Sequence, residues 1–205
     1  GVVNFDPMPK MFFNKKLKNF RLSNINQKIK LLSNLKVDFV ITKRFDKKFS
    51  KTKALNFISQ ILNKKLSSKF IFVSNNFRFG NKREGNVNLL KRYEQLFNYK
   101  VVKPEPLIKS KKIVSSSLIR NLLEKGLLDK ANNLLKRNWT IQGVVRRGRQ
   151  VGKKIGFPTC NIDIGDYVLA KPGVYAVKVL RKNSNKYLKG IANLGYRPTF
   201  NQKNY

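Results

Sequence analysis

A glycine-rich stretch at residues 146–162, RRGRQVGKKIGFPTCNI, contains the residue types that bind nucleotide phosphates. It places glycines at four-residue intervals, at Gly148, Gly152 and Gly156. Glycine lets backbone amides approach a phosphate closely, and Lys153 adds positive charge. The stretch is not a Walker loop, because that loop needs Gly-Lys-Ser/Thr at the start of a helix. It therefore predicts a phosphate site of another kind.

The end of the same stretch offers oxygen ligands. Pro158 fixes an extended turn, which would hold the Thr159 hydroxyl near the side-chain amide of Asn161. Both oxygens suit a Mg²⁺ ion that nucleotide phosphates already bind. The alternative is a structural turn in a hairpin of a small barrel, although a turn alone does not require Thr and Asn at these positions.

A second candidate is the run VSSSLIR at residues 114–120. Hydroxyls at a helix start leave backbone N–H groups pointing outward, and such a terminus binds phosphate. Arg120 lies about one turn inside the predicted helix and could form charge-assisted bonds to the same anion. The alternative is an ordinary serine N-cap followed by an exposed arginine.

A third candidate is the loop SNNFRFGNKREG at residues 74–85. It follows a predicted buried strand, so its polar residues would lie at the carboxyl end of a parallel sheet, where open α/β folds bind ligands. Asn76 could contact a nucleotide there. The alternative is a basic surface loop with Phe77 and Phe79 tucked into the core.

Strands alternate with helices in the part of the chain that must position the second and third candidates. Residues 37–42, 70–74 and 100–104 read as strands, because they are β-branched or aromatic runs between polar residues. The spacing of apolar residues predicts a helix with one apolar face formed by Ala54, Phe57, Ile58, Ile61 and Leu62. A weaker pattern predicts a second helix with Val87, Leu90, Tyr93, Glu94 and Phe97 on one face. This alternation predicts an α/β fold with a parallel sheet covered on both faces.

Two short helices are expected next, and an all-β part follows them. Ser115 or Ser116 can cap the first helix, Gly126 can close it, and the second runs to about Arg137. Strand-like runs separated by turn residues then occupy residues 139–145, 173–180 and 187–195. The prediction is an α/β domain at residues 1–137 and a small antiparallel β domain at residues 138–205.

Charge and composition limit the functions that the protein can have. The 205 residues include 45 Lys and Arg against 10 Asp and Glu, a net charge of +35, and 41% are hydrophobic, which is ample for a packed core. Such a field would hold nucleotides, RNA or acidic lipid near the surface. The alternative is a coding bias toward Lys and Asn, because the lysines are spread over every segment.

Cysteine and histidine usage excludes two further classes. Cys160 is the one cysteine and the chain has no histidine, so an internal disulfide and a structural zinc site are excluded, and a cytoplasmic location is expected. Apolar runs fall far short of the roughly 20 residues of a membrane span, so no membrane association is expected. The opening GVVNFDP reads as a strand without an initiator Met, which suggests that residues precede it.

Taken in order, these stretches resemble the prokaryotic bifunctional riboflavin kinase/FAD synthetase family. The segments that carry the resemblance are FDP at residues 5–7, NFRFG at 76–80, SSSLIR at 115–120, GFPTCN at 156–161, GVY at 173–175 and NLGYRPTF at 193–200. The resemblance implies a Rossmann-like FMN adenylyltransferase domain and then a β-barrel riboflavin kinase domain. It also implies ATP and Mg²⁺ as cofactors, with riboflavin, FMN and FAD as substrates and products.

The resemblance assigns roles to individual residues. Asn76 matches the nucleotide site of the adenylyltransferase, and Ser116, Ser117 and Arg120 match the family's Ser-Ser-Thr-x-x-Arg phosphate motif, with Ser for Thr at Ser117. In the kinase half, the segment from Gly148 to Gly156, including Gly152 and Lys153, would cover the ATP phosphates. Thr159 and Asn161 would hold Mg²⁺ and ATP. The flavin side would be contacted by Asn193 and Arg197.

The chain departs from the family pattern at three points. The family's Asp-Pro-His-Pro has Met8 in place of its histidine. The His-x-Gly-His motif would lie upstream of Gly1, and the glutamate that resembles the kinase base would lie beyond Tyr205. We therefore expect residues 1–205 alone to be inactive in both reactions.

Two other readings remain open from the sequence. A basic RNA-binding or ribosome-associated protein would explain the charge, although RNA binding does not require the GFPTCN turn. A monofunctional adenylyltransferase with a decayed kinase domain would explain the first half. We expect small molecules, namely riboflavin, FMN and ATP, as partners rather than nucleic acid.

Overall fold

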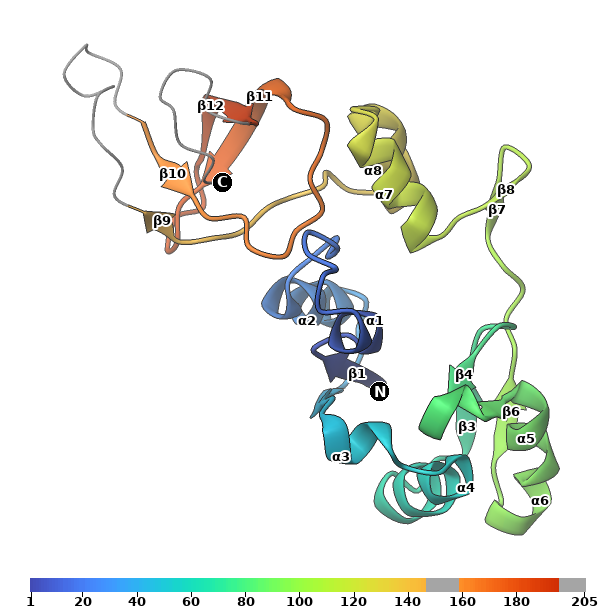
Figure 1. Ribbon diagram of the computed structural model, residues 1–205. Coiled ribbons are helices and arrows are strands. Elements are labelled where there is room, and N and C mark those ends of the chain that lie inside the picture. The colour runs from blue at the N-terminus through green and yellow to red at the C-terminus, as the bar shows by residue number, and fades with distance from the viewer. Residues whose placement is uncertain (147–158, 196–205) are drawn as a thin grey trace. The chain divides into compact units, whose positions relative to one another are not determined.

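A computed structural model describes residues 1–146 and 159–195 (Figure 1). The chain divides into two compact units. The first unit comprises Gly1–Lys16 and Leu32–Val114, and the second comprises Leu17–Leu31 and Ser115–Tyr205. The segment at residues 17–31 therefore leaves its sequence neighbours and joins the C-terminal part of the chain.

The first unit alternates strands with helices, as the sequence predicts. Its strands are β1 (Val2–Asp6), β2 (Val40–Arg44), β3 (Phe70–Phe72), β4 (Arg78–Phe79), β5 (Gly85–Asn86), β6 (Lys100–Val102), β7 (Ile108–Lys109) and β8 (Lys112–Ile113). Its helices are α1 (Pro9–Phe13), α3 (Lys47–Ser50), α4 (Ala54–Asn56), the π-helix η1 (Phe57–Lys65), the 3₁₀ helix η2 (Asn81–Arg83), α5 (Val87–Arg92) and α6 (Glu94–Phe97).

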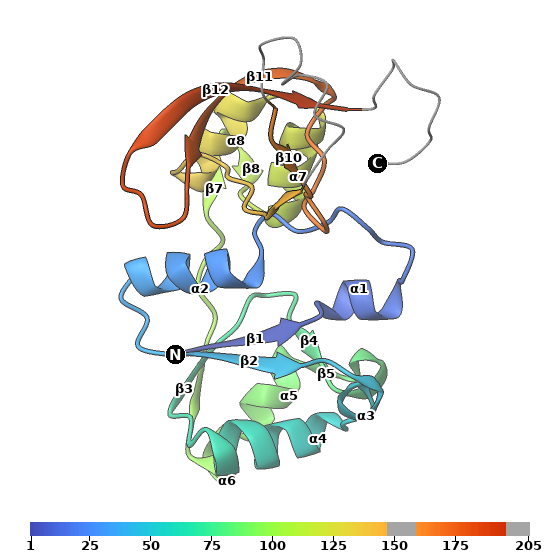
Figure 2. The ribbon, with the colours of Figure 1, turned by 90° about the vertical axis from the view of Figure 1, so that its left-hand side faces the viewer.

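Parallel pairing in this unit is limited to two pairs of strands among the described residues. β1 pairs with β2, with Val2 opposite Val40, and β3 pairs with β6, with Phe70 opposite Lys100. Figure 2 shows β1 and β2 side by side with α4 below them. The hairpins β4–β5 and β7–β8 are antiparallel. The unit is thus an α/β structure with small sheets.

The strand predicted at residues 37–42 begins later, at Val40. The reason lies in the end of the preceding helix, α2 (Ile25–Asn34). The amide of Val37 donates to the carbonyl of Leu32, and Lys36 adopts a left-handed φ of 58°, so these residues close the helix. They cannot also extend the strand.

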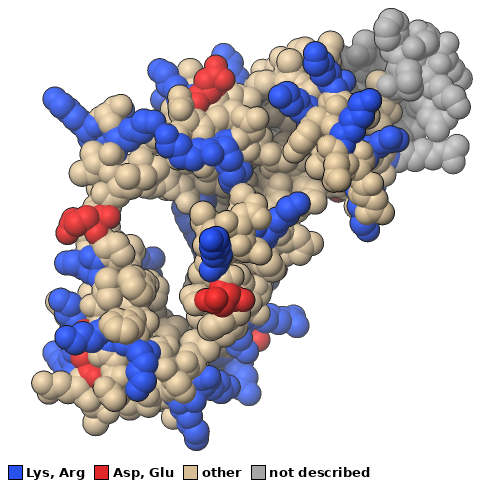
Figure 3. All heavy atoms as spheres, turned by 180° about the vertical axis from the view of Figure 1, so that it is seen from behind, with Lys and Arg blue, Asp and Glu red and all other residues tan. Residues whose placement is uncertain are grey.

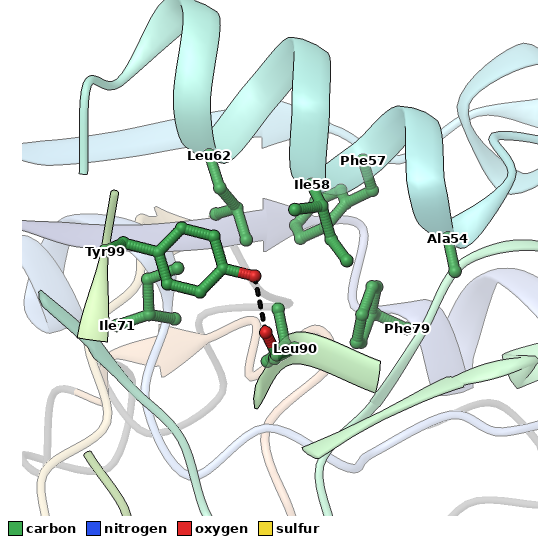
Figure 4. Packing of buried hydrophobic residues seen from close by; sticks show 8 residues of the cluster. All are labelled: Ala54, Phe57, Ile58, Leu62, Ile71, Phe79, Leu90 and Tyr99. Atoms are coloured by element: carbon green, nitrogen blue, oxygen red, sulfur yellow. Dashed lines mark hydrogen bonds between the residues drawn. The ribbon is translucent and has the colours of Figure 1, made fainter. Parts of the chain in front are cut away.

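The core of the first unit forms under α4 and η1, which confirms the helical spacing read from residues 54–62. Figure 4 shows the side chains of these two helices directed toward β3, β4 and α5. The cluster consists of Ala54, Phe57, Ile58, Leu62, Ile71, Phe79, Leu90 and Tyr99. Tyr99 is 4% exposed, and its hydroxyl donates to the Leu90 carbonyl oxygen at 2.6 Å. Its polar atom is thereby satisfied inside an apolar cluster.

The second unit begins with two helices and continues in β structure. Its described elements after residue 114 are α7 (Ser116–Glu124), α8 (Leu128–Leu135), β9 (Val145–Arg146), β10 (Asn161–Ile162), β11 (Gly173–Leu180) and β12 (Tyr187–Leu194). β11 and β12 form an antiparallel hairpin with Gly173 opposite Leu194. These two strands match the predicted runs closely. Within residues 1–146 and 159–195 no strands close into a barrel.

One strand prediction in this unit is wrong. Residues 139–144 are irregular, and only Val145 and Arg146 are strand. The polar groups of this run are used elsewhere, because the Trp139 amide donates to Asn132 and the Thr140 carbonyl accepts from Gln27. A strand would need these backbone groups for its ladder.

The second core packs α7 and α8 against residues that follow β10. It consists of Ile119, Leu123, Ala131, Val168 and Ala170, with Trp139, Tyr175 and Leu194 packed against it. No helix in the described part of the chain has the length and apolar character to cross a membrane. On the face drawn in Figure 3, Lys and Arg side chains are spread among other residues rather than gathered in one stripe.

Candidate functional site

The start of α7 is a serine-capped helix N-terminus, as the sequence predicts. Ser115 is the N-cap, and its hydroxyl accepts the amide of Leu118 at 3.2 Å. Ser116 and Ser117 follow in the first turn and are exposed. A first turn carries backbone N–H groups that have no partner within the helix, and the helix dipole favours an anion there. The prediction of a capped helix at this point is confirmed.

Arg120 lies one turn further along α7, four residues after Ser116 and on the same helix face. It is not the exposed arginine of the simpler reading. Its Nε donates to the carbonyl oxygen of Phe20 at 2.7 Å, and its guanidinium carbon lies 3.6 Å from the centroid of the Phe20 ring. Burial lowers the pKa of Arg120, and Glu124 opposes that shift. The group stays charged near neutral pH, because an ordinary arginine loses its proton only in strongly alkaline solution.

The loop after β3 has the packed phenylalanines of the simpler reading and leaves Asn76 exposed. Asn76 lies in an exposed turn directly after the strand, where a ligand could reach its amide. Phe79 is buried in the first core, and Phe77 stacks on it at 5.4 Å between ring centroids. The two phenylalanines therefore anchor the loop that carries Asn76.

A close backbone contact at Gly80 fixes the same loop. Gly80 has φ +77°, and a Cβ at this position would lie 2.8 Å from the backbone of Ala54. Glu84, further along the loop, accepts the Ala54 amide at 2.6 Å. Only glycine fits here, because the conformation is left-handed and the neighbouring helix start leaves no space for a side chain.

The glycine-rich phosphate candidates Gly148, Gly152, Lys153 and Gly156 lie outside the described residues, as does Arg197. Thr159 and Asn161 are described. Thr159 is exposed, and Asn161 is half-buried in β10, opposite Arg146 of β9. The two side chains are separated by one residue, so an extended backbone places them on the same side.

The donor set at Thr159 and Asn161 fits a nucleotide-borne Mg²⁺ better than a resident metal ion. Both residues offer neutral oxygens, which Mg²⁺ accepts when phosphates supply the charge. The residues that the structure describes include no group of three or more His, Cys, Asp and Glu that could hold a metal ion.

Asn193 is exposed on β12, opposite Val174 of β11. The carboxylates of this part of the chain have structural partners. Asp163 accepts the Gly165 amide at 2.8 Å, and Asp166 lies 3.7 Å from the Nε of Arg21. Both carboxylates therefore have a role in holding the local backbone or a neighbouring side chain.

Sequence reasoning missed the segment at residues 17–27, which we call the strap. One local signal was readable: Asn24 and Gln27 exchange side-chain and backbone hydrogen bonds at 2.8 and 3.0 Å, a capping box at the start of α2. The role of the preceding residues was not readable, because their partners lie about a hundred residues or more away in the sequence.

The strap is held at several points within the second unit. The amide of Arg21 donates to Asp166 at 2.7 Å, and the carbonyl of Arg21 accepts from Val168 at 2.8 Å. The indole N–H of Trp139 donates to the Leu22 carbonyl at 3.0 Å. Further contacts join Asn19 to Gly165, Gln27 to Thr140, and Gln27 to the Tyr167 hydroxyl. These contacts fix the backbone on both sides of Phe20, and thus the carbonyl and ring that Arg120 meets.

Comparison with known proteins agrees with the motif order. The FAD synthetase family model matches residues 1–118, and the riboflavin kinase model matches residues 135–205. A bifunctional riboflavin kinase/FMN adenylyltransferase from Buchnera aphidicola subsp. Schizaphis graminum is 38% identical over 200 residues, covering 97% of this chain and 64% of the relative. The protein of that name from Escherichia coli K12 is 36% identical over 198 residues, covering 97% of this chain and 63% of the relative.

A solved structure has the same fold. The crystal structure titled as a macrolide-efflux protein from Streptococcus pneumoniae matches with a TM-score of 0.76 and 24% identity, covering 97% of this chain and 64% of that one. This likeness bears on the fold alone. The chain spans about 64% of the length of the curated relatives. On the FAD synthetase match, which covers more than half of its residues, the chain belongs to the FAD synthetase family, and a riboflavin kinase segment follows in the same chain.

Proposed function

We propose that the protein makes FAD in two steps. In the first, a hydroxyl oxygen of riboflavin attacks the γ-phosphorus of ATP, which gives FMN and ADP. In the second, a phosphate oxygen of FMN attacks the α-phosphorus of another ATP, which gives FAD and pyrophosphate. The observation that carries this proposal is the succession of FAD synthetase and riboflavin kinase matches along one chain.

Adenylyl transfer is assigned to residues that match the motifs of the FAD synthetase family. The exposed first turn of α7, with Ser116 and Ser117, would bind a phosphate of ATP through hydroxyls and backbone amides. Arg120 would add charge-assisted bonds to the negative charge that develops on the leaving pyrophosphate. Asn76, held after β3, would bind the nucleotide through its side-chain amide.

Riboflavin phosphorylation is assigned to the C-terminal part. Thr159 and Asn161 would hold ATP with its Mg²⁺, which neutralises phosphate charge when bound. Gly148, Gly152, Lys153 and Gly156 would cover the phosphates. Asn193 and Arg197 would contact the flavin. The support for these roles is the resemblance of this half of the chain to the family and, for Thr159, its exposure.

The finer architecture belongs to the same proposal. The two parallel strand pairs of the first unit support a Rossmann-like nucleotidyltransferase sheet, and the β11–β12 hairpin supports a small antiparallel kinase barrel. We place the functional boundary at residues 137 and 138. We also expect a cytoplasmic protein whose partners are riboflavin, FMN and ATP rather than nucleic acid or membrane.

Two substitutions in the full-length protein separate the half-reactions. Arg120→Gln should impair conversion of FMN to FAD and leave FMN formation intact, whereas Asn161→Ala should do the reverse. Loss of one charge-assisted contact predicts a decrease of roughly ten- to a hundredfold in the affected kcat/KM. Each variant is the other's control, since both must fold to keep their unaffected reaction. If either substitution leaves both rates unchanged, that residue's role is wrong.

A further inference from the structure

The strap brings to Arg120 a side chain that lies outside the segments on which the family resemblance rests. Phe20 lies in the strap, a hundred residues before Arg120, and its ring and carbonyl both contact the guanidinium. The strap is fastened on each side of Phe20, because Asn19 donates to Gly165 and Arg21 pairs its backbone with Asp166 and Val168. Phe20 is therefore presented by a fixed backbone rather than by a free loop.

The two contacts constrain different features of the guanidinium. The Phe20 carbonyl oxygen accepts a hydrogen bond from the Nε–H of Arg120 at 2.7 Å. This bond fixes the edge of the guanidinium nearest the helix. The Phe20 ring lies against its face at 3.6 Å, which fixes the plane. Arginine presents its remaining N–H groups in a rigid planar fork, so the terminal nitrogens stay available for phosphate oxygens.

We infer that Phe20 is a positioning residue for Arg120 and sets the orientation in which its terminal nitrogens meet the phosphates of ATP in FMN adenylylation. This inference rests on the function proposed above. A long arginine side chain loses conformational freedom when it binds a ligand, and Phe20 removes much of that freedom in advance. The half-buried setting, which lowers the pKa of Arg120, also strengthens its electrostatic contact with the ring.

The test replaces the ring and keeps the carbonyl. Phe20→Leu in the full-length protein removes the aromatic face but retains an apolar side chain, and Phe20→Tyr restores the face. A cation–π contact of this kind predicts that Phe20→Leu raises the KM for ATP in FAD formation by about three- to tenfold. Phe20→Tyr should return KM to near the original value, and the kinase reaction should keep its KM in both variants.

A double-substitution cycle separates positioning from a loss of packing. In an Arg120→Gln background, Phe20→Leu should cause no further loss in FAD formation, because there is no guanidinium left to orient. The matched control is Phe97→Leu, which makes the same chemical change in α6 of the first unit, where Phe97 stacks on Tyr93. This control should leave the KM for ATP unchanged.

Three results would overturn the inference. The first is an unchanged KM in Phe20→Leu while Arg120→Gln is impaired. The second is a double variant whose decrease in FAD formation equals the product of the decreases in the two single variants. Phe20 would then have a structural role independent of Arg120. The third is a failure of the unsubstituted protein to form FAD, which would overturn the proposed function as well and is thereby distinct from the other two.

Discussion

Replacement of Gly80 by alanine tests how the Asn76 loop is held. The position combines a left-handed φ of +77° with a crowded neighbour, because an added Cβ would lie 2.8 Å from the N, Cα and Cβ atoms of Ala54. Gly80 cannot move away freely. The next amide, of Asn81, donates to the Thr52 carbonyl at 2.7 Å, and Glu84 caps the Ala54 amide.

The expected cost is the sum of two effects. An L-residue in the left-handed region costs roughly 1–2 kcal/mol. Insertion of a methyl group into a packed contact costs about 1–3 kcal/mol more, because the start of α4 must shift. Gly80→Ala should therefore lower the free energy of unfolding of the first unit by roughly 2–5 kcal/mol and its melting midpoint by roughly 10 °C or more.

A second glycine supplies the control. Gly165 also has a positive φ, +48°, but a Cβ there would meet nothing within 4 Å. Gly165→Ala should therefore show only the conformational cost, about 1–2 kcal/mol, in the unfolding of the second unit. Urea unfolding followed by circular dichroism measures both variants. The crowding argument is refuted if Gly80→Ala is no more destabilising than Gly165→Ala.

Two further predictions concern single hydrogen bonds. Burial, with smaller contributions from Glu94 and Tyr93, raises the pKa of Tyr99 to about 12. Its contribution to stability is therefore complete below pH 10 and is lost as the pH rises toward 12, up to about 3 kcal/mol. Tyr99→Phe should lose roughly 1 kcal/mol at neutral pH but show a shallower loss between pH 10 and 12, and an unaltered alkaline slope in urea titrations would contradict this. Ser115→Ala removes the α7 N-cap and should cost about 1 kcal/mol of second-unit stability, measured by urea unfolding. Ser117→Ala, at an exposed serine in the first turn of the same helix, is the control, and equal midpoints for the two variants would refute the cap.

Local patterns predicted the elements whose stability is local. The spacing at residues 54–62 predicted α4 and η1, and the serines at the start of α7 predicted its cap. The alternating run at residues 173–180 predicted β11 to the residue. In each case the signal is a periodicity or a capping residue, which acts within one element.

Long-range pairing could not be read in the same way. Residues 139–144 have the composition of a strand, yet Trp139 and Thr140 give their polar groups to Leu22, Asn132 and Gln27. The contact of Arg120 with Phe20 is equally invisible, because nothing near either residue in the sequence specifies the other. The family motifs can be read from the sequence, but the strap that contacts Arg120 cannot.

The central claim is that one protein carries both steps of FAD synthesis. The most direct measurement incubates the full-length protein with riboflavin, ATP and Mg²⁺ and separates the flavins by chromatography over time. The account predicts that FMN forms first and FAD follows, with one pyrophosphate released for each FAD. A folded protein that forms neither flavin product would contradict it.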